Sequence, residues 1–510
     1  MKSKPRRGFR ISTRIIISAA AILLQIAVTL LMVFSMFHNV VFFYLLIEFL
    51  SIILSITIVN SNINPSYKLS WVTFILLLPF VGVTAYMFWG SGRIFPHLRK
   101  RMEKSEKIYA GLLPDDTAAE NRLAYEDLHH CKQARYLSNE TAFPIYCNTE
   151  TEYLSPGEVF LPRLIEELEK AVDFIFLEFF ILGEGNMWDE IHSVLRRKVA
   201  EGVECRVIFD DFGSIKRQEK HFTDVLRKEG IYVSVFNKIR PSVDIFMNNR
   251  DHRKIVIIDG KVAFTGGINI GDEYINLVSP HGYWMDSAIM LKGDAVRSFT
   301  VMFLNMWMFN TGKRLDSSRY IKSYTADFDG FVLPYCDGPL NDSNPAEGIY
   351  LQMLNTSQRY IYIVSPYLII GNEMMTALTL AAKSGIDVRI ITPKIWDKWY
   401  VHPVTQQNYK PLLEAGVKIY EYTPGFIHSK IFISDDAVAT VGTVNMDYRS
   451  FFFHFECGVW MCRSKSVAQI KKQVLEILPQ CEEIKLEKWE KRPLTTKLKQ
   501  QLLSILAPFM

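Results

Sequence analysis

The chain has 510 residues, of which 49% are hydrophobic and 22% charged. This length is sufficient for two or three domains, and the apolar content excludes a wholly disordered chain. The net charge of +4 is unevenly distributed, because residues 1–110 hold 13 Lys or Arg against 3 Asp or Glu. The other residues hold 45 against 51. This acidic balance argues against a nucleic-acid-binding protein, which binds phosphates through an excess of Lys and Arg.

Three apolar segments lie near the N-terminus, at about residues 15–37, 40–59 and 69–90, and Glu48 is their only charged residue. Each approaches the roughly 20 residues that a membrane span requires. We therefore expect residues 1–110 to form a membrane region of a multi-pass cell-membrane protein. Basic residues flank the segments on both sides, and positive flanks prefer the cytoplasm. The part of the chain that follows these segments would then be cytoplasmic. Two cytoplasmic flanks need an even number of spans, so the sequence leaves the topology open.

The seven cysteines are odd in number and show no paired spacing. This argues against a disulfide framework and fits a reducing compartment. The run His129, His130 and Cys131 is the one local suggestion of a metal site, but no nearby residues in the sequence complete a ligand set. We expect neither a metal nor another cofactor.

Beyond the membrane region, the same order of elements occurs twice. A mostly apolar strand is followed by a segment of helical spacing that ends at a glycine, and then by another strand. The segments are 172–182, 186–202 and 203–211 in the first half, and 359–370, 372–385 and 386–394 in the second. This order predicts right-handed crossovers in a largely parallel sheet. We therefore predict an α/β fold with two homologous lobes, 111–335 and 336–510, separated near a loop at 337–345.

Each half then reaches the same polar pattern. His, Lys and Asp recur 176 residues apart, followed at fixed spacing by Gly, a second small residue and Asn, so that His and Asn are 17 positions apart in both copies. The two copies, spanning 252–269 and 428–445, are His252, Lys254, Asp259, Gly266, Gly267 and Asn269, and His428, Lys430, Asp435, Gly442, Thr443 and Asn445. If each histidine only packed within its own hairpin, the two copies would not be expected to keep the same spacing over 17 positions.

These residue types suit a phosphate group. Each copy is predicted to lie on a strand, so its His and Lys, two residues apart, face the same side. The Lys ammonium is a point charge for phosphate oxygens, and His can attack phosphorus or transfer a proton near neutral pH. The Asp can fix the tautomer of a histidine by accepting its other N–H. One histidine can be the nucleophile while the other protonates the leaving group, so one active site needs both halves. The symmetry of the repeat leaves open which histidine attacks.

The repeat resembles the phospholipase D superfamily, whose members carry two His-x-Lys-x-x-x-x-Asp motifs. Four longer stretches, 64–90, 249–274, 282–290 and 424–456, resemble the bacterial cardiolipin synthase family in particular. The similarity covers nearly the whole chain from about residue 60. It implies two phospholipase D-like lobes packed around a pseudo-twofold axis and preceded by N-terminal transmembrane helices.

The resemblance also implies a reaction. Two phosphatidylglycerol molecules would give cardiolipin and glycerol through a phosphohistidine, without a metal. His252 would be the nucleophile and His428 the proton donor and later acceptor, while Asp259 and Asp435 would support the site electrostatically or structurally. Glu456 matches an acid that orients a histidine in the family. The phosphate oxygens would be held by Lys254, Lys430, Asn269, Asn445, Gly267 and Thr443.

The expected partners are phosphatidylglycerol and anionic membrane lipids, with no nucleic acid, and the oligomeric state is open. A hydrolytic phospholipase D or a phosphatidylserine synthase is the alternative, and a membrane-bound nuclease is a weaker one. Tyr283, Trp284 and the aromatic run 451–455 are predicted to wall the pocket against water, which favours transfer. The C-terminal segment 497–510 is basic at its start and then apolar, and it fits either a membrane surface or packing on the second lobe.

Overall fold

The computed structural model describes residues 20, 23–29, 31, 38–61, 63–90, 96–113, 117–239, 248–341, 343–505 and 507–509. The chain divides into two compact units. The first is Met1–Phe95 with Ile239–Asn248 and Phe509, and the second is Pro96–Lys238 with Asn249–Pro508 and Met510.

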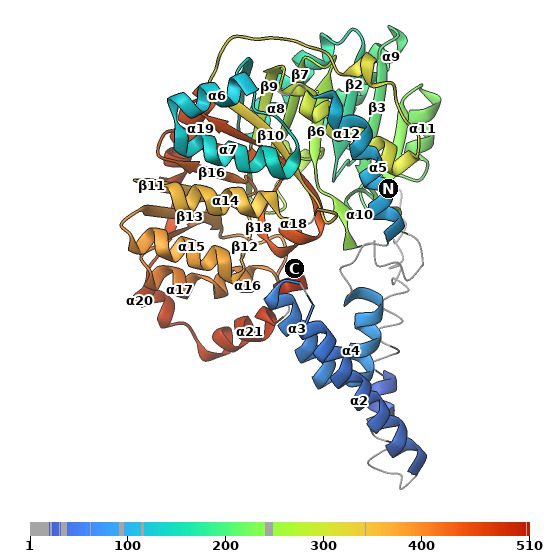
Figure 1. Cartoon of the computed structure of the whole chain (residues 1–510), viewed down its shortest axis with the longest axis vertical. Helices are drawn as coiled ribbons and strands as arrows, with labels where there is room; N and C mark the ends of the chain where they lie inside the picture. The colour runs from blue at the N-terminus through green and yellow to red at the C-terminus, as the bar shows by residue number, and fades with distance from the viewer. Residues whose placement is uncertain are drawn as a thin grey trace, which may run out of the picture. The chain divides into compact units, whose positions relative to one another are not determined.

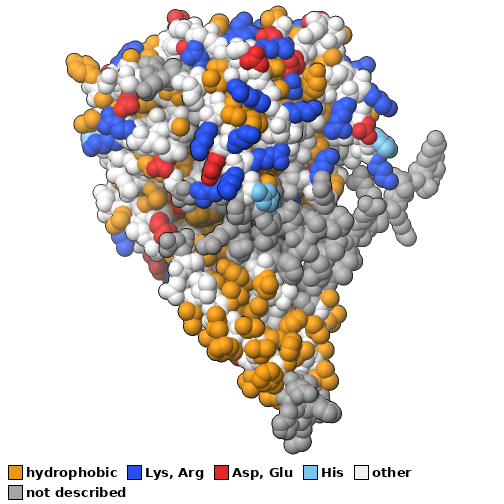
Figure 2. All heavy atoms as spheres, turned by 45° about the vertical axis from the view of Figure 1, so that its right-hand side comes forward, with side chains coloured by type: hydrophobic (Ala, Val, Ile, Leu, Met, Phe, Trp, Pro, Cys, Tyr) orange, Lys and Arg blue, Asp and Glu red, His pale blue; other side chains and the backbone are white. Residues whose placement is uncertain are grey.

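The described part of the first unit is helical. It contains α2 (His38–Val59), α3 (Pro65–Leu77), α4 (Pro79–Ala85) and a π-helical turn, Tyr86–Gly90. Within α2, Val41–Val59 has the length and composition of a membrane span, and Figure 2 shows apolar side chains covering much of the surface of this unit.

Of the three predicted spans, one is therefore found among the described residues. The predicted segment 15–37 lies largely outside them. The predicted segment 69–90 is not one α-helix, because α3 ends at Leu77 and α4 begins at Pro79. Proline has no N–H for the helical ladder and favours the first position of a new helix.

The second unit contains two large sheets (Figure 1). Their strands follow the same order. In the first sheet the order is β1 (Thr149–Leu154), β9 (Ala288–Gly293), β7 (Val262–Gly266), β6 (Lys254–Ile258), β2 (Phe174–Phe179), β3 (Glu204–Asp210) and β4 (Tyr232–Phe236). In the second it is β10 (Phe331–Asp337), β19 (His454–Cys462), β17 (Val438–Gly442), β16 (Ile431–Ser434), β11 (Tyr360–Val364), β13 (Asp387–Pro393), β14 (Lys418–Tyr422) and the additional β20 (Cys481–Ile484). The repeat in the sequence is thus a repeat in the fold.

The predicted strand–helix–strand segments are present in both lobes. They are β2, α9 (Asn186–Ala200) and β3 in the first, and β11, α15 (Asn372–Lys383) and β13 in the second, and the strands of each set pair in parallel. The prediction of a largely parallel sheet is nevertheless wrong. Most neighbours in both sheets, including β6 with β7 and β16 with β17, are antiparallel, and only β2–β3–β4 and β11–β13–β14 run parallel along the two strand orders. The pairs β6–β7 and β16–β17 are antiparallel because tight hairpins return the chain at once.

Helices cover both sheets. Helix α12 (Val296–Thr311) is buried over most of its length and packs against β4, β6 and α5 (Pro96–Tyr109). The other helices are α6 (Thr117–Glu126), α8 (Gly157–Glu169), α10 (Asp211–Ser214), α11 (Phe222–Lys228), α13 (Ser317–Tyr320), α16 (His402–Gln407), α17 (Tyr409–Glu414), α18 (Tyr448–Phe452), α19 (Lys465–Ile477), α20 (Leu486–Glu490) and α21 (Leu494–Ser504), with α7 and α14 described next.

One helix crosses between the lobes. Helix α7 (Leu128–Thr141) precedes the first strand of the first sheet in the sequence but packs against β10 and α14 (Pro345–Thr356) of the second lobe (Figure 1). Its Gln133 donates a hydrogen bond to Thr356 Oγ1 at 2.6 Å and accepts one from Trp460 Nε1 at 3.0 Å. The residues predicted to open the first lobe therefore include a helix that completes the core of the other.

Two short pairs of parallel strands also join the lobes. Strand β5 (Arg250–Asp251) of the first lobe pairs with the start of β19, and β15 (Gly425–Ile427) of the second lobe pairs with β8 (Tyr283–Met285). A further short pair, β12 (Leu368–Ile369) with β18 (Met446–Asp447), lies within the second lobe. The two joining strands β5 and β15 each end immediately before a motif histidine.

Candidate active site

The two motif histidines are held by the opposite lobe. The backbone N–H of His252 donates to Phe455 O at 2.9 Å, and that of His428 donates to Met285 O at 2.7 Å. Both side chains are buried. These bonds continue the pairs β5–β19 and β15–β8, so the strand pairing that joins the lobes also places each histidine.

Each imidazole is oriented by a carboxylate from the other lobe. His252 Nδ1 lies 2.9 Å from both carboxylate oxygens of Glu456, on β19, and His428 Nδ1 lies 2.6 Å from Asp286 Oδ2, just after β8. A carboxylate that accepts the Nδ1 proton leaves Nε2 free to face the reacting atom. The sequence pointed to Glu456 but not to Asp286. Asp286 is 17 residues after Asn269 whereas Glu456 is 11 after Asn445, so the repeat did not align them.

The motif lysines lie beside the histidines. Lys254 Nζ donates to the backbone oxygen of His252 at 2.7 Å, and Lys430 Nζ donates to that of His428. Burial lowers the pKa of Lys254 to about 8 and that of Lys430 to about 7. A bound anion would raise the pKa of both lysines and so favour their charged ammonium forms.

Both motif histidines are neutral near pH 7, because their pKa values are lowered. Burial, together with the charge of Lys430, lowers the pKa of His428 to about 4. Burial and then the charge of Lys254 lower the pKa of His252 well below its ordinary value. A neutral imidazole with a free Nε2 lone pair is the nucleophilic form.

The motif aspartates lie at the other end of the hairpins. A strand rises roughly 3.3 Å per residue, so seven residues separate His252 from Asp259 by about 20 Å. Each aspartate accepts three consecutive backbone N–H groups at the start of the neighbouring strand. Asp259 accepts from Val172, Asp173 and Phe174, and Asp435 accepts from Gln358, Arg359 and Tyr360. Asp259 and Asp435 therefore attach each hairpin to the neighbouring strand of its sheet. The histidines are oriented by Glu456 and Asp286 instead.

The two residues at the ends of the motif strands pack against the orienting acids. A Cβ atom at Gly267 would lie 2.1 Å from Asp286 Oδ1, so only glycine leaves room for that carboxylate. At the equivalent position of the second lobe, Thr443 Oγ1 donates to Glu456 Oε2. Both residues, predicted to bind phosphate, therefore contact the acids that hold the histidines.

The motif asparagines differ in their contacts. Asn269 accepts from the Ile181 N–H at 3.0 Å and donates to the Tyr274 hydroxyl at 2.8 Å. The Tyr274 ring lies 6.0 Å from that of His428. Asn445 Oδ1 is buried and has no hydrogen-bond partner among the described residues. Asn269 is thus fixed within the lobe, whereas Asn445 retains an acceptor for a ligand.

The surroundings of the two histidines are not equivalent. The ring centroid of Trp284 lies 5.3 Å from that of His428, and the ring centroid of His454 lies 5.5 Å from that of His252. His454 is 9% exposed, and neither of its ring nitrogens makes a hydrogen bond among the described residues. Of the residues predicted to wall the pocket, Trp284 and His454 lie beside the motif histidines. Tyr283 instead donates to Glu158, and Phe455 packs on Phe236 and Phe309.

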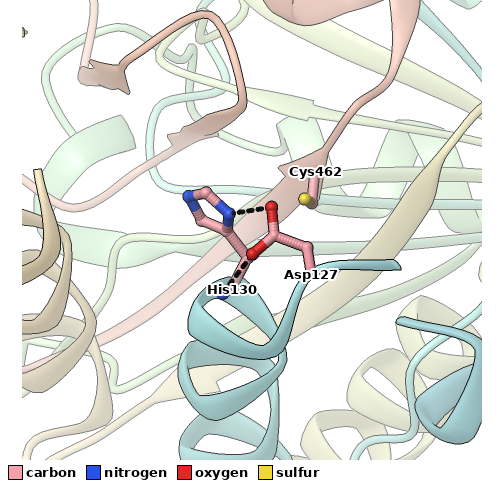
Figure 3. Close-up of side chains that lie close together, drawn as sticks. All are labelled: Asp127, His130 and Cys462. Carbon is pink, nitrogen blue, oxygen red and sulfur yellow. Dashed lines mark hydrogen bonds and ion pairs between the residues drawn. The ribbon is translucent and has the colours of Figure 1, made fainter. Parts of the chain in front are cut away.

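Two sets of potential metal ligands occur among the described residues. One is His252, His454 and Glu456, with donor atoms within 4.8 Å of one another, and it belongs to the site above. The other is Asp127, His130 and Cys462 (Figure 3). Cys131, which follows His130 in the sequence, is not part of this set, because its thiol faces Glu120 O at 3.7 Å.

The second set has a structural explanation. Asp127 caps α7 by accepting the His130 N–H at 3.2 Å, and it lies 2.7 Å from His130 Nδ1 (Figure 3). Arg463 also approaches Asp127, at 3.3 Å. Burial raises the pKa of the Cys462 thiol and so disfavours the thiolate that binds metals. These contacts account for the arrangement as a helix cap.

Known proteins resemble the chain over most of its length. The family described as "Cardiolipin synthase, PLD-like domain" matches residues 164–307 and 350–478, and "Phospholipase D-nuclease N-terminal" matches 49–91. A cardiolipin synthase of Geobacillus sp. (strain WCH70) is 33% identical, over 88% of this chain and 90% of its own. An uncharacterized protein of Streptococcus mutans serotype c is 39% identical, over 89% and 98%.

The fold of the two lobes also occurs in a solved structure. The phosphatidylserine synthase of Haemophilus influenzae Rd KW20 superposes with a TM-score of 0.54 at 14% identity, covering 74% of this chain and 98% of its own. At this level of identity the match concerns the fold of the two lobes.

Proposed function

Because the chain belongs to the cardiolipin synthase family with phospholipase D-like domains, we propose that it joins two phosphatidylglycerol molecules into cardiolipin and glycerol. The observation that carries the mechanism is the pair of neutral histidines, each hydrogen-bonded to a carboxylate of the opposite lobe. Two such imidazoles around one phosphate can divide nucleophilic attack and proton transfer between them.

In the first step, His252 Nε2 attacks the phosphorus of one phosphatidylglycerol. The P–N bond forms, the P–O bond to the headgroup glycerol breaks, and the glycerol oxygen takes a proton from His428. His428, neutral before the lipid binds, takes up this proton on Nε2 from water, because the bound phosphodiester anion raises its pKa. Asp286 stabilises the resulting imidazolium through the bond to Nδ1.

In the second step, the headgroup hydroxyl of another phosphatidylglycerol gives its proton to His428 and attacks the phosphorus. The P–N bond breaks, cardiolipin leaves and His252 is regenerated. Lys254 and Lys430 hold the phosphoryl oxygens and offset their charge. Asn445 and His454 suit the glycerol hydroxyls, because Asn445 Oδ1 and both ring nitrogens of His454 make no hydrogen bond among the described residues. His454 Nδ1 lies 3.8 Å from Glu456 Oε1.

Transfer rather than hydrolysis requires that water be kept from the phosphohistidine. Trp284 and Tyr274 beside His428, and Phe180 at 5.0 Å from the ring of His252, line the site with aromatic surface. We propose that this lining favours a lipid hydroxyl over water as the acceptor.

We further propose that the N-terminal region anchors the chain in the cell membrane through more than one span, with the catalytic unit in the cytoplasm. The support is the spanning length of Val41–Val59 and the basic residues that flank the apolar segments.

The products distinguish these functions. The purified full chain is incubated with phosphatidylglycerol alone in vesicles, and the lipids are identified by mass. We expect cardiolipin and an equal amount of glycerol, with little phosphatidic acid. Because one phosphodiester is exchanged for another, glycerol added to cardiolipin vesicles should regenerate phosphatidylglycerol. If phosphatidic acid dominates and glycerol has no effect, the protein is a hydrolase.

A further inference from the structure

The second lobe exposes an aromatic loop between β13 and α16. In this loop, residues 395–400, Trp396 is 48% exposed, Trp399 57% and Tyr400 39%. Large aromatic side chains are usually buried in soluble proteins. Trp and Tyr are, however, enriched where a protein meets the boundary between a membrane and water.

The C-terminal helix α21 exposes an apolar stripe. Leu494, Leu498 and Leu502 are 81%, 54% and 59% exposed, and their spacing of four places them on one side of the helix. The helix packs on α16, with Leu503 against a cluster that contains Val401 and Val404. The exposed leucines are therefore not the ones that attach the helix to the lobe.

The loop and the helix form one continuous surface. The loop leads directly into α16, on which α21 packs (Figure 1), and Lys499 Nζ of α21 lies 5.4 Å from the ring centroid of Trp399. We call this the aromatic surface, comprising Trp396, Trp399, Tyr400, Leu494, Leu498 and Leu502.

Its charge is basic. Residues 491–510 contain four basic residues, Lys491, Arg492, Lys497 and Lys499, and no Asp or Glu. The one acid of the loop, Asp397, accepts a hydrogen bond from the Tyr367 hydroxyl at 2.6 Å. Apolar and aromatic side chains framed by cations fit an anionic bilayer surface. A symmetric contact with a second copy would instead bring like charges together.

The aromatic surface borders the active site. Lys398 Nζ, in the same loop, lies 3.3 Å from the Tyr367 hydroxyl. Tyr367 packs against the core cluster that includes Tyr274 and Trp284, the two aromatic neighbours of His428. Tyr367 thus links the loop to the core cluster that contains the aromatic neighbours of His428.

We propose that the aromatic surface docks on an anionic bilayer and that loop 395–400 is the point where phosphatidylglycerol leaves the membrane for the site. This goes beyond the proposed function but rests on its lipid substrate. It also gives the catalytic unit its own membrane contact, independent of the N-terminal helices.

Photo-crosslinking tests the docking directly. The full chain is reconstituted in vesicles that contain phosphatidylglycerol with a diazirine in its acyl chain, irradiated, and digested for mass spectrometry. We expect labelled peptides from 395–400 and 494–505. Labels confined to the N-terminal helices would overturn the proposal. In a parallel sample treated with a bifunctional amine reagent, crosslinks between Lys398 and Lys499 of two copies would assign the surface to self-association instead.

A kinetic comparison separates docking from chemistry. The double variants Trp396→Ser/Trp399→Ser and Leu498→Gln/Leu502→Gln are assayed with phosphatidylglycerol in vesicles and with short-chain phosphatidylglycerol below its micelle concentration. We expect at least a tenfold loss with dilute vesicle substrate and unchanged rates with the monomeric lipid. Tyr125→Ser on α6 and Leu380→Gln on α15, which replace side chains 93% and 57% exposed, are the matched controls and should change neither rate.

The two assays also keep the proposals apart. Cardiolipin formation from the monomeric lipid tests the proposed reaction without any bilayer. If that reaction proceeds but the double variants behave like the controls, the docking surface is wrong while the synthase function stands. Equal losses on both substrates would place these residues in folding or catalysis and would also overturn the docking.

Discussion

Two kinds of carboxylate serve each lobe, and the motif pattern alone does not separate them. Asp259 and Asp435 bond to backbone N–H groups of the sheet, whereas Asp286 and Glu456 bond to the histidines. The sequence identified the motif aspartates first because their spacing is regular. Their position at the far end of the hairpin follows only once the length of the strand is known.

Substitution should therefore separate stability from chemistry. Asp286→Asn cannot stabilise the imidazolium of His428, and we expect kcat to fall about 10–100-fold with little change in thermal stability. Asp259→Asn weakens charge-assisted bonds to the backbone, and we expect it to lower the free energy of unfolding by about 1–3 kcal/mol while kcat per folded molecule stays near the original. Thermal unfolding in detergent and activity of the folded fraction check both. A larger kcat loss in Asp259→Asn than in Asp286→Asn would return the catalytic role to the motif aspartate.

The buried lysines predict an unusual pH dependence. Lys430, with its pKa lowered to about 7, is charged below this pH and loses its proton above it. We therefore expect kcat/KM, which reports the free enzyme, to fall as pH rises through about 7. It should not fall between pH 6.5 and 5.5, because the pKa of His252 lies well below its ordinary value. The pH profile of Lys430→Arg is the comparison, since an arginine keeps its charge. An acid limb near pH 6.5 in the wild type would contradict the neutral nucleophile.

At the scale of elements, the sequence predicted the strands and helices better than their directions. Apolar runs located β2 and β3 with the helix between them, because burial on both faces leaves that pattern. They do not specify direction, and most neighbours in each sheet are antiparallel, some through tight hairpins such as β6–β7 and others through longer connections such as that between β2 and β6. The break before Pro79 could have been predicted from the proline itself.

The cross-lobe contacts could not be predicted in the same way. The pairs β5–β19 and β8–β15 join segments far apart in the sequence, and the strands are too short to leave a pattern. The partners of the histidines depend on these pairs. Asp286 was missed for that reason, and Glu456 was found only through resemblance to a family.

The end of the β7 strand offers a test at a single backbone position. A methyl group at Gly267 would meet the Asp286 carboxylate at 2.1 Å, and we expect Gly267→Ala to lower kcat more than tenfold by displacing that acid from His428. Gly111→Ala is the control, because a Cβ there meets no atom within 4 Å. Steady-state rates of the two variants check this. Equal activity of both would mean that the contact between Gly267 and Asp286 has no role in positioning the histidine.

At the scale of the whole molecule, the reaction should not require a divalent metal. Lys254 and Lys430 place two potential cations beside the two histidines, where they can supply the positive charge that a metal supplies in other phosphoryl-transfer enzymes. We expect activity to survive excess EDTA with unchanged kcat. Loss of activity on chelation, with recovery on adding back one divalent ion, would contradict the metal-free mechanism.

The central claim is that two lobes build one site in which His252 is the nucleophile and His428 moves the proton. The most direct measurement uses phosphatidyl-p-nitrophenol, whose phenolate leaves without needing a proton, followed by denaturing quench and mass analysis of the protein. In His428→Ala we predict a burst of one nitrophenolate per active site and a phosphatidyl group trapped on the peptide that contains His252. In His252→Ala we predict neither burst nor adduct. An adduct in His252→Ala, or steady turnover in either variant, would show that the lobes do not share one site in this way.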